Sequence, residues 1–211
     1  KPTAGSSDPK DQRRFEFTIK GVVKDTIYLA NYYGNKLMYN DTAIADAKGK
    51  VVFAKKRGYR AGVYAVVIPG PRYFEFLVNE PVVVMNSDTA DLGAKLVVVN
   101  SPENQVFMDY VRYINAQRKE ADAVQKEREA TLDPIKKSAL KERLVGYEKA
   151  IRAYQEELIA EHPGTFVATI VRMSMSPEEK EVHKADGTLD SAGTYYRFRA
   201  HFWDNTDLTD E

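Results

Sequence analysis

Hydrophobic and polar positions alternate along short segments in the first half of the chain, which is the two-residue period of β-strands. Gly, Pro, Asn and Asp separate these segments. We expect about eight strands, over residues 15–19, 26–33, 36–46, 51–54, 62–68, 73–78, 81–86 and 95–100. No helical pattern lies between them, so the sequence predicts an antiparallel sandwich or partly open barrel rather than a parallel α/β sheet.

The hydrophobic period changes to that of a helix at Ser101. Ser101 suits an N-cap and Pro102 the first helical position. The highly charged run over residues 116–131 offers few core positions and indicates a solvated helix end and connector. Pro134 then opens a second helix, which stops at the Glu-His-Pro-Gly stretch of residues 161–164.

The second helix carries a narrow apolar seam whose spacing alternates between four and three residues, as in a coiled coil. Its members are Leu140, Leu144, Tyr147, Ile151, Tyr154 and Leu158. We expect the hairpin over residues 101–161 to pack on itself or on the β half. The alternative is a homodimer, in which the 140–158 helix pairs with a second chain.

The remaining sequence predicts a short apolar helix over 165–175, a charged loop over 178–193 and an amphipathic element over 194–203. The fold class is therefore α+β: an antiparallel β-sandwich or partly open barrel followed by a helical hairpin and shorter helices. The expected domains are a disordered N-terminal tether (1–14), a β domain (15–100), a helical region (101–203) and a linker (204–211).

Charge and composition exclude several classes of function. Lys plus Arg and Asp plus Glu both number 31, so the net charge is zero, which argues against nucleic-acid binding and against a polybasic membrane surface. The chain has no cysteine, which removes thiol chemistry and disulfides. No apolar run approaches the ~18 residues that a membrane span needs.

No pattern of a catalytic, cofactor or metal site is present. The three histidines, His162, His183 and His201, lie too far apart in the sequence for a paired-ligand motif. The serines lack a nucleophile-elbow context, and no glycine-rich loop leads from a strand into a helix. We therefore assign no catalytic, cofactor-binding or metal-binding residue.

Tyrosines are concentrated in the strand half of the chain. Tyr28, Tyr32, Tyr33, Tyr39 and Tyr64 lie within predicted strands. A tyrosine offers apolar area together with a hydroxyl, so a tyrosine-rich sheet face can bind sugar rings or a peptide. Tyr32 and Tyr33 are the candidate ligand face, and the simpler alternative is that these tyrosines divide between the core and the rim of the sandwich.

The order of motifs resembles a known combination of domains. The strand Tyr28-Leu29-Ala30-Asn31-Tyr32-Tyr33-Gly34, with Gly21, Asp41-Thr42, Gly49, Phe53 and Gly62-Val63-Tyr64, resembles the DUF4369-type N-terminal domain. The continuation from "SPENQVFMDY" through "HPGTFVATIVRMSM" to "YYRFRAHFWDN" is similar to a DUF5106-like helical region. Both precede thioredoxin-like domains in exported proteins of Bacteroidetes.

The resemblance implies a non-catalytic accessory module of a periplasmic or cell-envelope thiol–disulfide oxidoreductase. A thioredoxin-like domain with a Cys-x-x-Cys motif would follow this chain, and a lipid anchor or cleaved signal would precede it. Phe202 and Trp203 would then contact the following domain. The alternative function is a stand-alone extracytoplasmic binding protein for a glycan or peptide. Neither reading makes this chain itself an enzyme.

Overall fold

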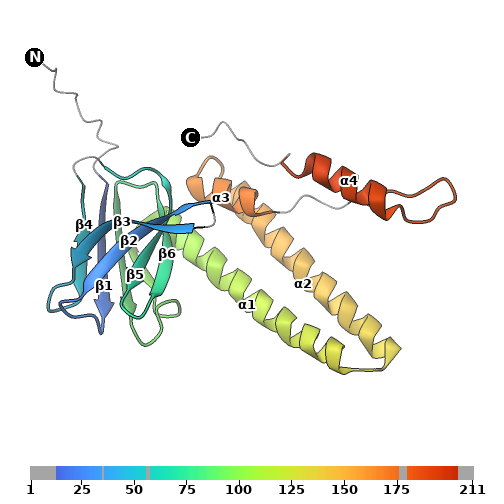
Figure 1. The fold of residues 1–211 in the computed structure, drawn as a ribbon, viewed down its shortest axis with the longest axis horizontal. Coiled ribbons are helices and arrows are strands. Elements are labelled where there is room, and N and C mark those ends of the chain that lie inside the picture. Colours follow the sequence, from blue (N-terminus) through green and yellow to red (C-terminus); the bar gives the residue numbers. More distant parts are fainter. Residues whose placement is uncertain (1–12, 35, 56–57, 176–179, 204–211) are drawn as a thin grey trace, which may run out of the picture. The chain divides into compact units, whose positions relative to one another are not determined.

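The computed structural model describes residues 13–34, 36–55, 58–175 and 180–203 (Figure 1). Residues 1–12 and 204–211, most of the predicted tether and the whole predicted linker, lie outside this range. The chain forms two compact units, Lys1–Arg112 and Tyr113–Glu211. Their boundary lies within the first helix rather than at Ser101, because the first turns of that helix bond to the β unit.

The β unit contains eight strands in two four-stranded sheets, ordered β4-β1-β7-β8 and β3-β2-β5-β6. The strands are β1 (Arg14–Lys20), β2 (Thr26–Tyr33), β3 (Lys36–Ile44), β4 (Lys50–Phe53), β5 (Gly62–Ile68), β6 (Arg72–Val78), β7 (Val82–Asp88) and β8 (Val97–Asn100). This arrangement and the helices that follow confirm the α+β class (Figure 1).

One strand pair departs from the antiparallel pattern. β1 runs parallel to β7, with Arg14 beside Val82 and Lys20 beside Asp88, whereas the other described pairs are antiparallel. Parallel strands need a long connection. The chain between β1 and β7 supplies it, because it builds β4 and all four strands of the second sheet.

Phenylalanine rings fill the core of the β unit. Alternation along β1 turns Phe15 and Phe17 to the same side of the sheet, and both are fully buried. The Phe17 ring meets Phe76 and Phe53 edge-on, at centroid distances of 5.0 and 6.3 Å. Burying a ring of this size contributes about 1.5–3 kcal/mol, so these phenylalanines are a main source of the unit's stability.

The first helix, α1 (Pro102–Ala130), is bonded to the edge of the β3-β2-β5-β6 sheet by a buried asparagine. The Leu77 N–H in β6 donates to Asn104 Oδ1 at 2.7 Å, and Asn104 Nδ2 donates to the Leu77 carbonyl at 2.8 Å. Ser101 Oγ accepts from the Asn104 N–H at 3.2 Å, which confirms Ser101 as the N-cap. Ser101 Oγ also donates to the Glu80 carboxylate.

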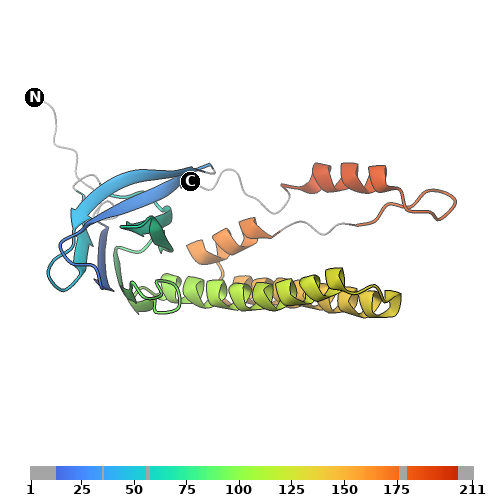
Figure 2. The same ribbon diagram turned by 60° about the horizontal axis from the view of Figure 1, so that its bottom comes forward.

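The second unit is built on a helical hairpin. Figures 1 and 2 show the later part of α1 and α2 (Pro134–Glu161) running side by side in opposite directions. The Tyr113 and Tyr154 rings lie 4.1 Å apart, and Lys136 pairs with Glu127 at 2.9 Å. The hairpin therefore packs on itself, as expected. Pairing with a second chain remains a prediction.

Two further helices follow the hairpin. α3 (Phe166–Ser174) is capped by Thr165, whose hydroxyl accepts from the Ala168 N–H, and it buries an apolar side that includes Val167 and Val171. α4 (Ser191–His201) is capped by Asp190, which accepts from the Gly193 N–H at 2.9 Å.

Several strand ends differ from the prediction by one or two residues, and β1 begins at Arg14, inside the predicted tether. Two helix boundaries differ further. The charged run over 116–131, predicted as a helix end and connector, is helical as far as Ala130, because Lys, Glu, Gln, Arg and Ala are strong helix formers and Val124 is buried. The last helix begins at Ser191 rather than at 194, since Asp190 caps it there. Both differences lengthen helices that the pattern had already indicated.

We expect Asn104→Ala to lower the free energy of unfolding of the β unit by about 2–4 kcal/mol, because it leaves the buried Leu77 N–H and carbonyl without partners. Urea unfolding followed by circular dichroism measures the change. Asn115→Ala, at an exposed position of the same helix, is the matched control. Equal midpoints for the two variants would contradict this role for Asn104.

Candidate functional site

The most distinctive surface of the β unit is the outer face of the β3-β2-β5-β6 sheet. Its floor is made by Ala30, Ala65 and Val67, which are buried and form a small apolar cluster separate from the phenylalanine core. Four partly exposed tyrosines surround this floor. We call the surface the tyrosine face and define it by Tyr28, Tyr32, Tyr39, Tyr73 and Glu75 around that floor.

Strand register places these residues together. Ala30 lies beside both Tyr39 and Ala65, and Ala65 lies beside Glu75. Two residues after Ala65 in β5, Val67 lies between Tyr28 of β2 and Tyr73 of β6. Paired residues share a face and alternate residues return to it, so side chains from β2, β3 and β6 meet over one floor.

Specific contacts hold the tyrosine rings. The Tyr28 and Tyr39 rings lie 5.0 Å apart at an angle of 56°. The Tyr32 hydroxyl donates to the Glu75 carboxylate across the face. This hydrogen bond, followed by partial burial, raises the pKa of Tyr32 above its ordinary value, so the hydroxyl keeps its proton and remains a donor near neutral pH.

The sequence-predicted tyrosines do not all lie on this surface. Tyr32 and Tyr33 are neighbours in β2, so their side chains point to opposite sides of the sheet, and Tyr33 is 80% exposed. Tyr64 faces the core, where its ring contacts Tyr59 and Phe76. Tyr73 and Glu75 were missed, because only the β5–β6 register brings them beside Val67 and Ala65.

A second aromatic surface lies at the end of the described chain. The Phe198, Phe202 and Trp203 rings form a row, with centroid distances of 5.6 and 4.9 Å. Phe202 is 40% exposed and Trp203 is 61% exposed. No residue of α4 is buried, and the described part of the chain leaves Phe202 and Trp203, just past the end of this helix, exposed.

The three histidines lie in separate parts of the helical unit. His162 caps α2, His183 forms a backbone bridge with Leu189 and has its Nε2 3.5 Å from a Glu181 carboxylate oxygen, and His201 is the last residue of α4. Among the described residues, no group of His, Asp or Glu has an arrangement that could hold a metal ion. No helix in that part of the chain is long and apolar enough to cross a bilayer.

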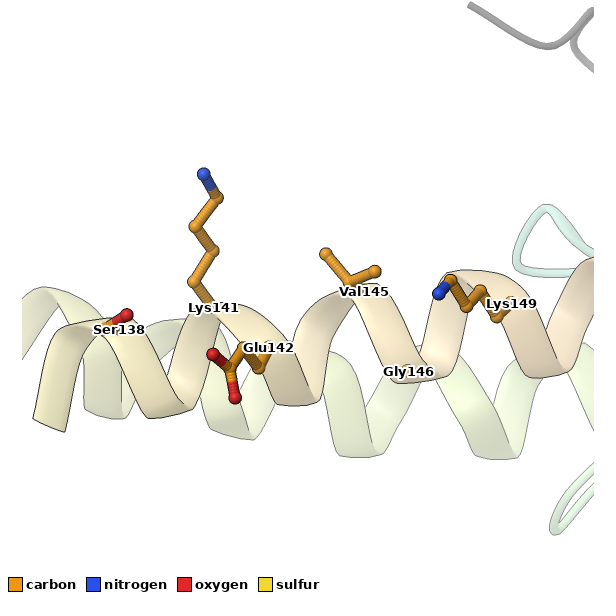
Figure 3. Close-up of a pocket in the computed structure, with 6 residues that line it drawn as sticks. All are labelled: Ser138, Lys141, Glu142, Val145, Gly146 and Lys149. Carbon is orange, nitrogen blue, oxygen red and sulfur yellow. The ribbon is translucent and has the colours of Figure 1, made fainter.

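A shallow hollow lies on the exposed side of α2 (Figure 3). Gly146 leaves space there, and the other lining residues are Ser138, Lys141, Glu142, Val145 and Lys149. They all come from one helix, and Figure 3 shows them strung out along it rather than converging on a point. The hollow therefore has no arrangement suited to catalysis.

Comparison with known proteins does not identify a family. No protein-family model and no curated protein matches the chain. Among solved structures, an (S)-allantoin synthase aligns with 44% of this chain and 45% of its own, at 9% identity and a TM-score of 0.31. The 5-hydroxyisourate hydrolase of Klebsiella pneumoniae aligns with 42% of this chain and 93% of its own, at 7% identity and a TM-score of 0.26. Similarities this low say nothing about the activity of this chain.

We expect stability to fall at alkaline pH, in part through Tyr59. Burial and a 2.6 Å hydrogen bond to Asp41 Oδ2 raise the pKa of Tyr59 above its ordinary value. The folded protein therefore holds this proton more tightly than the unfolded chain. The stabilisation is complete below the ordinary tyrosine pKa of about 10 and is lost as the pH rises toward the folded pKa.

Urea midpoints measured from about pH 8 to about pH 11 test this linkage. Tyr59→Phe should be less stable at pH 8, because it loses the bond to Asp41, but its stability should fall less steeply with pH. Tyr195→Phe, at a 59% exposed position, is the control and should follow the parent protein. Parallel curves for Tyr59→Phe and the parent would show that Tyr59 is not responsible.

Proposed function

We propose that this chain is a non-catalytic accessory module of an exported thioredoxin-like thiol–disulfide oxidoreductase, in the periplasm or cell envelope. It positions the redox domain or its client proteins. The observation that carries the proposal is the aromatic row of Phe198, Phe202 and Trp203, of which Phe202 and Trp203 are exposed. Large exposed apolar surfaces of this kind are typical of contacts with another domain or protein.

The amino-acid composition also supports a non-catalytic function for this chain. The chain contains no cysteine, so a redox function requires the reactive thiols to be in another domain. The partner we propose is a C-terminal thioredoxin-like domain with a Cys-x-x-Cys motif, with a lipid anchor or signal upstream of Lys1. The resemblance of residues 15–207 to DUF4369-type and DUF5106-like regions favours that partner.

The intact mass of the protein from its source organism tests this proposal. We expect a mass well above the 23.9 kDa of this sequence, and C-terminal peptides that contain Cys-x-x-Cys. A native mass close to 23.9 kDa would overturn the accessory function.

Trp203, the single tryptophan of the chain, reports on the proposed contact. The chain labelled with 5-fluorotryptophan should give one ¹⁹F resonance, which should shift when the separately produced thioredoxin-like domain is added. Phe202→Ala should weaken the interaction by about tenfold, because it removes a ring that packs edge-on against Trp203. Tyr33→Ala, on the β unit, is the control, and equal effects of the two variants would argue against docking at this row.

A homodimer through the 140–158 helix belongs to the same proposal. Leu140 and Leu158 are buried within the chain, so a partner chain would contact the opposite side of α2, around Val145 and Gly146 (Figure 3). Val145→Glu should then yield a monomer in sedimentation velocity, with Leu189→Glu, an exposed position outside α2, as the control. A monomeric parent protein would exclude this dimer.

The second candidate function is a stand-alone extracytoplasmic binding protein for a glycan or peptide. The tyrosine face is the observation that favours it, because its rings and hydroxyls remain accessible around a buried floor. Under either function we assign this chain no catalytic role and no nucleic-acid partner.

A further inference from the structure

The tyrosine face extends over all four strands of the β3-β2-β5-β6 sheet. Tyr28 and Tyr32 lie four positions apart along β2, a span of about 13 Å. Tyr39 and Tyr73 lie on β3 and β6, the two outer strands of the four, which spans about 14 Å across the sheet. Ala30 and Ala65 are fully buried, so the surrounding side chains cover this floor, and the accessible surface of the face is that of the tyrosine rings.

The face carries one kind of charge. Glu75 is the only charged side chain among its outward positions in the described strands; the others are Thr26, Tyr28, Ala30, Tyr32, Leu37, Tyr39, Thr42, Ile44, Val63, Ala65, Val67, Tyr73 and Leu77. With no Lys or Arg to offset Glu75, an anionic ligand such as a phosphorylated or nucleic-acid chain is repelled. This charge favours a neutral or cationic ligand over an anionic one.

Polar groups are clustered on one side of the platform. The Tyr32 hydroxyl donates to Glu75, and Tyr73 is close enough to Tyr32 to contribute to its electrostatic environment. A carboxylate has about four acceptor sites, so Glu75 can accept from a ligand hydroxyl as well as from Tyr32. The face thus offers ring surfaces, hydroxyls and a carboxylate within one area.

We propose that the tyrosine face binds a neutral polysaccharide along several consecutive sugar rings. A pyranose has an apolar C–H face that packs on an aromatic ring, and hydroxyl edges that bond to tyrosine hydroxyls and a carboxylate. A repeating chain of such rings matches a platform that extends across four strands. This inference rests on the binding function proposed second above.

The strand pairing disfavours a peptide at the same place. An extended peptide usually binds a sheet by adding a strand to a free edge. The floor of the tyrosine face lies on β2 and β5, and each is already paired on both sides, β2 with β3 and β5, and β5 with β2 and β6. A peptide there would bind through side chains alone.

A cationic ligand is the other alternative. Recognition of a quaternary ammonium group relies on aromatic rings that enclose the charge. The four tyrosines are instead spread over three strands of an open face, and Glu75 already accepts a hydrogen bond from Tyr32. Both features favour a neutral ligand with many hydroxyls.

Affinity gel electrophoresis of the whole chain tests the proposal. The gels contain, separately, a soluble mannan, a β-glucan, a xylan and the anionic polymer polygalacturonate. We expect at least one neutral polymer to retard the protein and polygalacturonate to leave it unchanged, because Glu75 repels that polymer. Poly-lysine in a further gel probes the cationic alternative.

Three variants locate the binding surface. Tyr73→Ala removes a 49% exposed ring and should weaken retardation by about tenfold. Tyr32→Phe keeps the ring and removes the hydroxyl, so it should weaken binding less. Tyr196→Ala, a 65% exposed tyrosine on α4, is the matched control and should behave like the parent. Circular dichroism verifies that all variants are folded.

The outcomes separate this inference from the functions on which it builds. Absence of retardation by every neutral polymer, or retention of full binding in folded Tyr73→Ala, overturns it. Retardation by poly-lysine alone, lost in Tyr73→Ala, overturns it in favour of a cationic ligand and preserves a binding role for the face. The accessory function is tested by the native mass and is unaffected by any of these results.

Discussion

The structure depends on one side chain that substitutes for a missing strand. β6 is the last strand of its sheet, and an edge strand normally leaves N–H and C=O groups without partners. Asn104 bonds to both such groups of Leu77, from a position three residues past the N-cap Ser101. The same amide therefore satisfies the sheet edge and fixes the place where α1 leaves it. A sheet edge closed in this way is also unavailable for pairing with another chain at that point.

The two sides of the β3-β2-β5-β6 sheet differ in their residues. Phenylalanines fill the inner side of the β3-β2-β5-β6 sheet, whereas the outer side combines alanines with tyrosines. Ala30 and Ala65 contribute little buried area, so they are poor residues for core stability. They lie beneath the side chains that surround them, and the exposed tyrosine rings form the outer surface. This contrast supports the proposal that the outer side binds a ligand while the inner side stabilises the fold.

Local signals in the sequence predicted most of the helices and strands, but not which strands lie side by side. The strand positions, the N-cap at Ser101 and the start of α2 at Pro134 follow from residue type and spacing, and the structure agrees with them. The pairing of β1 with β7 does not follow from residue type and spacing, because it joins segments far apart in the chain. The tyrosine face also depends on strand pairing that the sequence pattern does not reveal. Alternation alone separates Tyr32 from Tyr33, whereas Glu75 joins Tyr32 only through the register of other strands.

The position of β1 between β4 and β7 has a consequence for how the protein is made. β1 precedes both of its neighbours in the chain, and one of them, β7, ends at Asp88. Until that residue has been made, one edge of β1 and its Phe15 and Phe17 rings have no complete partner surface. Contacts between such distant segments slow folding, and exposed apolar strands in the meantime favour aggregation. During synthesis β1 is therefore exposed until β7 has been made, and in that interval it is a target for chaperones.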